Sequence, residues 1–235
     1  WTLRHYVFGL KDAGVLSAYT TSVGMSALTA MIGTPFISML AHAIEKGGAG
    51  PRWLKSAIQA AASLPMGIPG LVLGIGYILF FNHPSNPLNF LYHSLALMVC
   101  ANVIHFYTPS HLTAMTALKG MDREFEAVAS SLHVPQWRTL WRVTIPVCLP
   151  SILDIFRYLF VNAMTTVSVL VFLYGSDTIP ASVSILHLDE AGETGPAAAM
   201  ATLIVLTTAA ASILHAMVSR FLLRRQVWRN PRQAD

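Results

Sequence analysis

The chain has 235 residues, 54% of them apolar and 11% charged, and its mean hydropathy is +0.55. Because soluble domains carry about 25% charged residues, this composition excludes an ordinary soluble domain and indicates an integral membrane protein. The net charge is +4, and most of the Lys and Arg residues lie between the apolar runs or near the C-terminus. A nucleic-acid-binding protein would need a basic, aromatic-studded surface stretch, so we expect no nucleic-acid partner.

The apolar windows predict the fold. A membrane-spanning helix needs about 20 mostly apolar residues, and five windows meet this requirement: 18–44, 57–81, 91–118, 147–174 and 196–222. We therefore expect an all-α polytopic membrane bundle of about five transmembrane helices within 18–222, preceded by an external segment at 1–17 and followed by a basic tail at 223–235. The chain begins with Trp, and its first 16 residues lack the apolar core of a signal peptide, so we expect a portion of a longer protein.

The positions of the Lys and Arg residues predict the orientation. Twelve of the 15 lie in the loops 45–56 and 119–146 or near the C-terminal end, whereas the segment 175–195 has four acidic residues and no Lys or Arg. Because cytoplasmic loops collect positive charge, we expect the N-terminus outside and the C-terminus inside.

The second window is rich in helix breakers. It contains "LPMGIPGLVLGIGYILFF", in which Gly70 and Gly74 are four residues apart. Such a pair allows another helix to approach closely, so we expect this helix to be packed inside the bundle.

A search for enzymatic chemistry finds no motif. The nine histidines are scattered, and Cys100 and Cys148 lie in or beside apolar runs, so we expect no metal site, no cofactor and no disulfide framework. No G-x-S-x-G elbow occurs, and "GPRWLKS" lacks the second glycine of a phosphate-binding loop. If the protein works against a gradient, the energy must come from a partner or from an ion.

Polar residues in the fourth window are candidates for function, because ionisable and polar groups in a membrane are costly. Asp154 and Arg157 are three residues apart and can form a structural pair. Asn162, Thr165 and Thr166 form a stripe at i, i+3 and i+4 spacing. The stripe, together with Ser168, either bonds to a neighbouring helix or faces a water-filled translocation path.

The charged loop between the third and fourth windows predicts two short amphipathic helices. Asp122 is a possible N-cap, and an apolar stripe follows at helical spacing; a second helix begins near Pro135, and Pro146 and Pro150 mark re-entry into the membrane. The stripe of the first helix contains Phe125, Val128, Ala129 and Leu132, and that of the second contains Trp137, Leu140 and Trp141. An apolar face of this kind lies either on lipid or in a groove of a partner.

The stretch "EFEAVASSLHVPQWRTLWRVTIPVCLP" resembles the cytoplasmic "EAA" loop of permease subunits of binding-protein-dependent ABC importers, the MetI-like family. Setting Pro146 on the proline of the family pattern places His133 on its glycine and Ala127 on its first glutamate. The resemblance implies that the first short helix is a coupling helix that seats in a cleft of the ATPase subunit. The coupling residues it implies are Glu124, Glu126, Ala127, Ala129, Ser130, Leu132, His133, Val134 and Trp137.

Three further segments look similar to permeases for 2-aminoethylphosphonate uptake, many of which are fused double permeases; this chain resembles their C-terminal half. The segments are "HFYTPSHLTAMTALKGMDREFEAVASSL", "RVTIPVCLPSILDIF" and "YLFVNAMTTVSVLVFLY". The family implies a multi-pass protein of the bacterial inner membrane that is a transport subunit and no enzyme.

The partners that the family implies are an ABC ATPase subunit that binds ATP, a second permease half or subunit, and an external or periplasmic solute-binding protein. Ferric-iron and polyamine permeases share the layout and remain alternatives for the cargo. Two remoter alternatives are a membrane-embedded enzyme and an ion-driven carrier. The carrier would need carboxylates within the spans, where only Asp154 is available.

Overall fold

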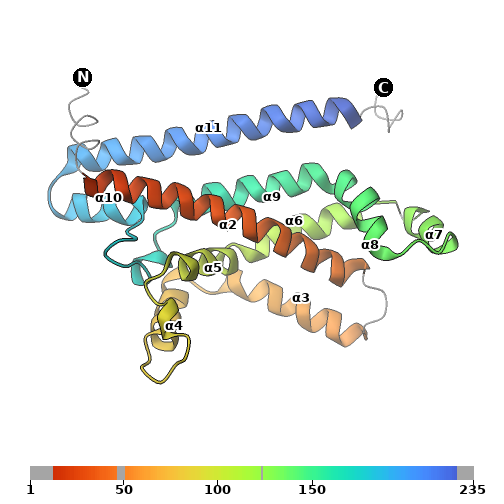
Figure 1. The fold of residues 1–235 in the computed structure, drawn as a ribbon, viewed down its shortest axis with the longest axis horizontal. Helices are drawn as coiled ribbons and strands as arrows, with labels where there is room; N and C mark the ends of the chain where they lie inside the picture. Colours follow the sequence, from red (N-terminus) through yellow and green to blue (C-terminus); the bar gives the residue numbers. More distant parts are fainter. Residues whose placement is uncertain (1–12, 47–50, 123, 227–235) are drawn as a thin grey trace.

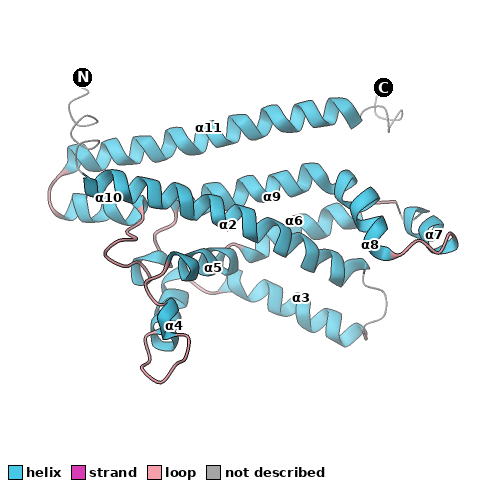
Figure 2. Cartoon of the chain, viewed as in Figure 1, coloured by secondary structure: helices cyan, strands magenta, loops and turns pink. Residues whose placement is uncertain are grey.

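The computed structural model describes residues 13–46, 51–122 and 124–226. Within these ranges the secondary structure is helical, with no strand, and the elements pack as an elongated bundle (Figures 1 and 2). The predicted all-α class is confirmed. Three helices of the described residues are long and apolar enough to cross a membrane, at Gly14–Lys46, Gln136–Thr165 and Thr194–Leu222, and a bent pair over 53–81 is a possible fourth span.

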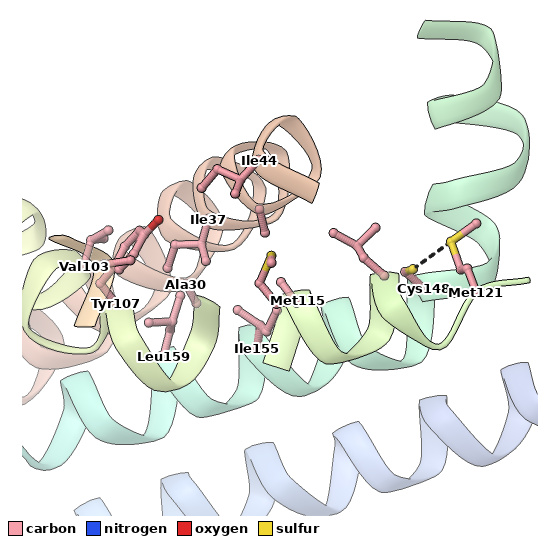
Figure 3. Close-up of a cluster of buried hydrophobic side chains, with 14 residues drawn as sticks. Ala30, Ile37, Ile44, Val103, Tyr107, Met115, Met121, Cys148, Ile155 and Leu159 are labelled. Carbon is pink, nitrogen blue, oxygen red and sulfur yellow. Dashed lines mark hydrogen bonds between the residues drawn. The ribbon is translucent and has the colours of Figure 1, made fainter. Parts of the chain in front are cut away.

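Two helices form the centre of the bundle: α2 (Ala13–Lys46) packs most extensively against α9 (Ile145–Thr165). A large core cluster joins them to α5 (Leu95–His105) and α6 (Tyr107–Lys119), and it includes Ile37, Val103 and Leu159 (Figure 3). Gly33 permits this close contact, because a Cβ there would lie 2.8 Å from Leu159 Cδ1.

The second predicted span is bent. Helix α3 (Arg52–Gly67) and α4 (Gly70–Phe81) meet at 105° instead of forming one helix over 57–81. The bend has a local cause: Pro69 has no N–H for a helical bond, and it holds the preceding Ile68 in an extended conformation at φ −103° and ψ 121°. After the bend, α4 packs on η3 (Leu170–Phe172) through Gly74, where a Cβ would lie 2.7 Å from Phe172 Cδ2. The expected close approach at this glycine pair therefore occurs, against a loop segment that follows α9.

The third window is also divided. After η1 (Asn89–Leu91), helix α5 begins at a Ser94 cap whose hydroxyl accepts the N–H of Leu97 at 3.2 Å. It ends at His105, and α6 begins at Tyr107. Pro109 explains the break, because its ring would clash with the carbonyl of His105 in a continuous helix but suits the first turn of a new one.

The fourth window ends as a helix nine residues early, at Thr165 rather than 174. Thr166 is extended, and its carbonyl accepts a 2.7 Å bond from Ser182 Oγ. Ser182 belongs to α10 (Ala181–Glu190), and its hydroxyl satisfies the Thr166 carbonyl, which would accept a backbone N–H if α9 continued. The last helix, α11 (Thr194–Gln226), is longer than the window 196–222 and lies along α9 and α10 (Figure 1).

Candidate functional site

A short hairpin projects from one end of the bundle. It consists of α7 (Glu124–Ser131) and α8 (Gln136–Thr139), and α7 packs mainly on α8 (Figure 1). Its apolar side chains are largely exposed: Phe125 by 48%, Val128 by 56% and Leu132 by 69% on or just after α7, and Trp137 by 61% and Trp141 by 66% on the second arm. A concentration of exposed large apolar side chains on one projecting segment is typical of an interaction site. We call these five residues the hairpin patch.

His133 ends α7 in a backbone conformation that suits glycine. Its φ is +52°, in the left-handed region that side chains with a Cβ rarely adopt. The N–H of Val134 donates to the carbonyl of Ala129 at 2.9 Å. This bond closes a Schellman motif, in which glycine usually occupies the position of His133. The alignment of His133 with a family glycine thus has a conformational explanation.

The second arm of the hairpin is continuous with the membrane core. Helix α8 passes through a π-helical turn, η2 (Leu140–Thr144), directly into α9, so that Gln136–Thr165 is one helix of 30 residues. Pro146 and Pro150, which we expected to mark re-entry into the membrane, lie within this helix and do not interrupt it. At the end of the π turn, Ile145 N–H donates to Leu140 O, five residues earlier. The wider turn lies directly before Pro146, which has no N–H for a helical bond.

The implied coupling residues lie in two different environments. Glu124, Leu132, His133 and Trp137 are exposed on the projecting end. Ala127, Ala129 and Val134 line a pocket of ≈ 360 Å³ together with Gln136, Thr139 and Thr144. The side chains of Glu126 and Ser130 lie outside the described residues. His42 and Lys46, at the end of α2, complete the pocket lining. Sequence reasoning missed both, although their i, i+4 spacing beside a cytoplasmic loop was a signal.

The four path candidates lie at the end of α9 and just after it. Asn162 Nδ2 donates to Tyr158 O at 2.8 Å, and Thr165 Oγ1 donates to Val161 O at 3.1 Å while its side chain is exposed. Thr166 caps α9. Ser168 lies against Gly70 at the start of α4, where the nearest other side chain is His105.

Asp154 has a different partner from the one expected. Its Oδ1 lies 3.2 Å from His215 Nε2 of α11, and in the described part of the chain no ion pair joins Asp154 to Arg157. The pairing with Arg157 is therefore wrong, because α11 lies along α9 and brings an imidazole to the carboxylate. Arg157 instead lines a largely apolar crevice of ≈ 310 Å³ between α2, α9 and α11. Among the described residues, no group of three or more His, Cys, Asp or Glu could hold a metal ion.

The solved structures that match this fold include bacterial ABC transporters. A bacterial importer of the acidic polysaccharide alginate gives a TM-score of 0.80 at 16% identity, covering 94% of this chain and 84% of that chain. The inward-facing MetNI methionine transporter gives 0.66 at 12% identity, covering 89% and 94%. At these identities the matches concern the fold alone.

The relatives that are similar in sequence include ferric and 2-aminoethylphosphonate permease proteins. A ferric transport system permease protein, FbpB of Actinobacillus pleuropneumoniae, is 28% identical over 211 residues, which are 87% of this chain and 29% of that protein. A putative 2-aminoethylphosphonate permease protein, PhnV of Salmonella paratyphi A, is 25% identical over 214 residues, 88% of this chain and 76% of that protein. The chain thus spans about three-tenths of the length of the FbpB relative.

A family model, described as "Binding-protein-dependent transport system inner membrane component", matches residues 33–224. That range includes the hairpin patch, the π turn and most of the described helices. The chain therefore belongs to the family of inner-membrane components of binding-protein-dependent transport systems.

Proposed function

We propose that this chain is the transmembrane permease unit of an ATP-driven importer in a bacterial inner membrane. The observation that carries the proposal is the hairpin patch, which exposes two Trp and three other large apolar side chains on a segment that projects from the bundle. In a member of this family, a separate ATPase with a complementary groove is the partner that fits such a segment. The chain itself performs no covalent chemistry and binds no ATP.

The same proposal assigns the other partners. One solved neighbour, an alginate transporter, is described in complex with a substrate-bound periplasmic protein. We propose a corresponding external solute-binding protein for this chain and a second permease unit, fused or separate, across the translocation path. Thr165, with Asn162, Thr166 and Ser168, remains our proposal for polar groups near that path.

The continuous helix gives the mechanism a physical basis. When ATP closes the two ATPase subunits, a displacement of the hairpin is transmitted along Gln136–Thr165, because this helix has no break between the patch and the membrane core. The permease then alternates between two packed arrangements, and ATP binding shifts their populations.

Ferric iron is our first candidate for the cargo and 2-aminoethylphosphonate the second. The sequence alone favoured the phosphonate, but the ferric relative has the higher identity, 28% against 25% over similar lengths of this chain. The polyamine alternative has no relative among those described above.

The test is retention of the ATPase by hairpin variants. Leu132→Asp places a carboxylate in an apolar contact, where burial without a partner costs several kcal/mol, so we expect at least a hundredfold weaker retention in nanodiscs. Leu186→Asp is the matched control, because Leu186 is 43% exposed on α10, away from the hairpin. Equal retention by both folded variants, or no ATPase bound to the wild type, would refute the proposal.

A further inference from the structure

One face of α9 carries two exposed polar side chains. The side chain of Asp154 is 51% exposed, and that of Thr165 is also exposed. They are 11 residues apart, about three helical turns, and so lie on the same face. Val147 and Val161, seven residues to either side of Asp154, lie on this face too. We call these four residues the α9 face.

The carboxylate on this face is held by one neighbour. Asp154 Oδ1 is 3.2 Å from His215 Nε2, and the same nitrogen lies 3.2 Å from Ser219 Oγ. No Lys or Arg of the described residues forms an ion pair with Asp154. The imidazole thus engages one oxygen of the carboxylate and orients it, while half of the side-chain surface stays open.

An open carboxylate cannot face lipid without a large cost. Asp154 lies nine residues after Ile145, where α9 begins, and eleven before Thr165, where it ends. These separations are about 14 and 17 Å along the helix axis, farther than the short Asp side chain can reach. Intramembrane carboxylates face water-filled cavities or charged partners. The exposure of this carboxylate on the same helix face as an exposed threonine therefore indicates an aqueous surface.

We propose that the α9 face lines the translocation path and that Asp154 contacts a positive charge on the cargo. The cargo class is then a metal cation or a molecule with an ammonium group, and a simple oxyanion is disfavoured. His215 is a positioning residue for this carboxylate. The inference rests on the proposed transport function and names the cargo chemistry of its path.

The first test measures water access and charge without needing transport. In a chain with Cys100→Ser and Cys148→Ala, Thr165→Cys should react with water-soluble methanethiosulfonates, whereas Val205→Cys, 63% exposed on α11, should be protected by lipid. At Val161→Cys, about 10 Å from Asp154, the ratio of cationic to anionic reagent rates should fall about fourfold when Asp154→Asn is added, because the charge changes each rate about twofold in water. An unreactive Thr165→Cys, or an unchanged ratio, would overturn the proposal even if transport is confirmed.

The second test identifies the charged cargo in the assembled importer. Asp154→Asn should raise KM at least tenfold for the transported cation, and His215→Asn, which keeps the carboxylate, should raise it less than threefold. Ferric iron and 2-aminoethylphosphonate are assayed separately, and ethylphosphonate, which lacks the amine, should not be transported. Loss of ATPase retention would count against the proposed function; normal retention with an unaltered KM in Asp154→Asn would overturn only this inference.

Discussion

Replacing His133 with glycine should stabilise the hairpin. At φ +52° a residue with a Cβ is strained by about 1–2 kcal/mol, and glycine removes that strain. Glycine also loses more chain entropy on ordering, about 0.5–1 kcal/mol. The net gain is about 0.5–1 kcal/mol, which reduces local opening by roughly two- to fivefold.

Amide hydrogen exchange of Val134 reports this change directly, since its N–H closes the motif by donating to Ala129 O. In nanodiscs, exchange at Val134 should slow two- to fivefold in His133→Gly, and His133→Ala, which keeps a Cβ, should show no slowing. Exchange that is unchanged or faster in His133→Gly would refute the strain argument, because the left-handed backbone would then cost nothing there.

Two further substitutions test the packing of the bundle. Gly74→Ala should destabilise the protein by about 1–3 kcal/mol, because the new Cβ meets the fixed Val169 carbonyl at 3.1 Å as well as Phe172. Gly33→Ala should cost less, because its new Cβ meets only the ends of side chains. Equal unfolding temperatures of the two variants in detergent would contradict this prediction. Ser22→Ala should lower the stability of the protein by about 1–3 kcal/mol. The buried N–H of Ala181 donates to Ser22 Oγ at 2.7 Å, and the substitution removes this acceptor. An unfolding temperature equal to that of the exposed control Ser63→Ala would contradict the prediction.

The apolar windows predicted the helical class, because apolar runs of about 20 residues have few other solutions in a membrane. They did not predict helix breaks. Pro69 and Pro109 were visible in the sequence, but a proline in a membrane helix is compatible with either a kink or a new helix. At Pro69, tertiary contacts explain why a new helix begins: Gly70 and Gly74 pack closely against the segment after α9.

The hairpin was predictable for a similar local reason, and the rest of the site was not. The apolar stripe of α7 repeats at helical spacing within eight residues, so its pattern is complete in one stretch. His42, Lys46 and His215 are brought to the site by packing against residues far away in the sequence. Local spacing suggested Arg157 for Asp154, whereas the packing of α11 supplied a histidine.

The continuous helix Gln136–Thr165 offers a test of mechanical transmission. Inserting one alanine after Thr144, between the π turn and α9, should rotate the hairpin by about 100° relative to α9, because each residue of an α-helix adds this angle. The hairpin patch remains intact, so ATPase retention should stay within threefold, but transport per ATP should fall more than tenfold because the displacement reaches α9 in the wrong direction. Deleting Arg142, an exposed residue, is the matched control: a π turn holds one residue more than the α-helical turn that replaces it, so the hairpin keeps its direction and transport should stay near normal. Full transport by the insertion variant would show that the direction of the hairpin is unimportant, and that force reaches the path through contacts other than this helix.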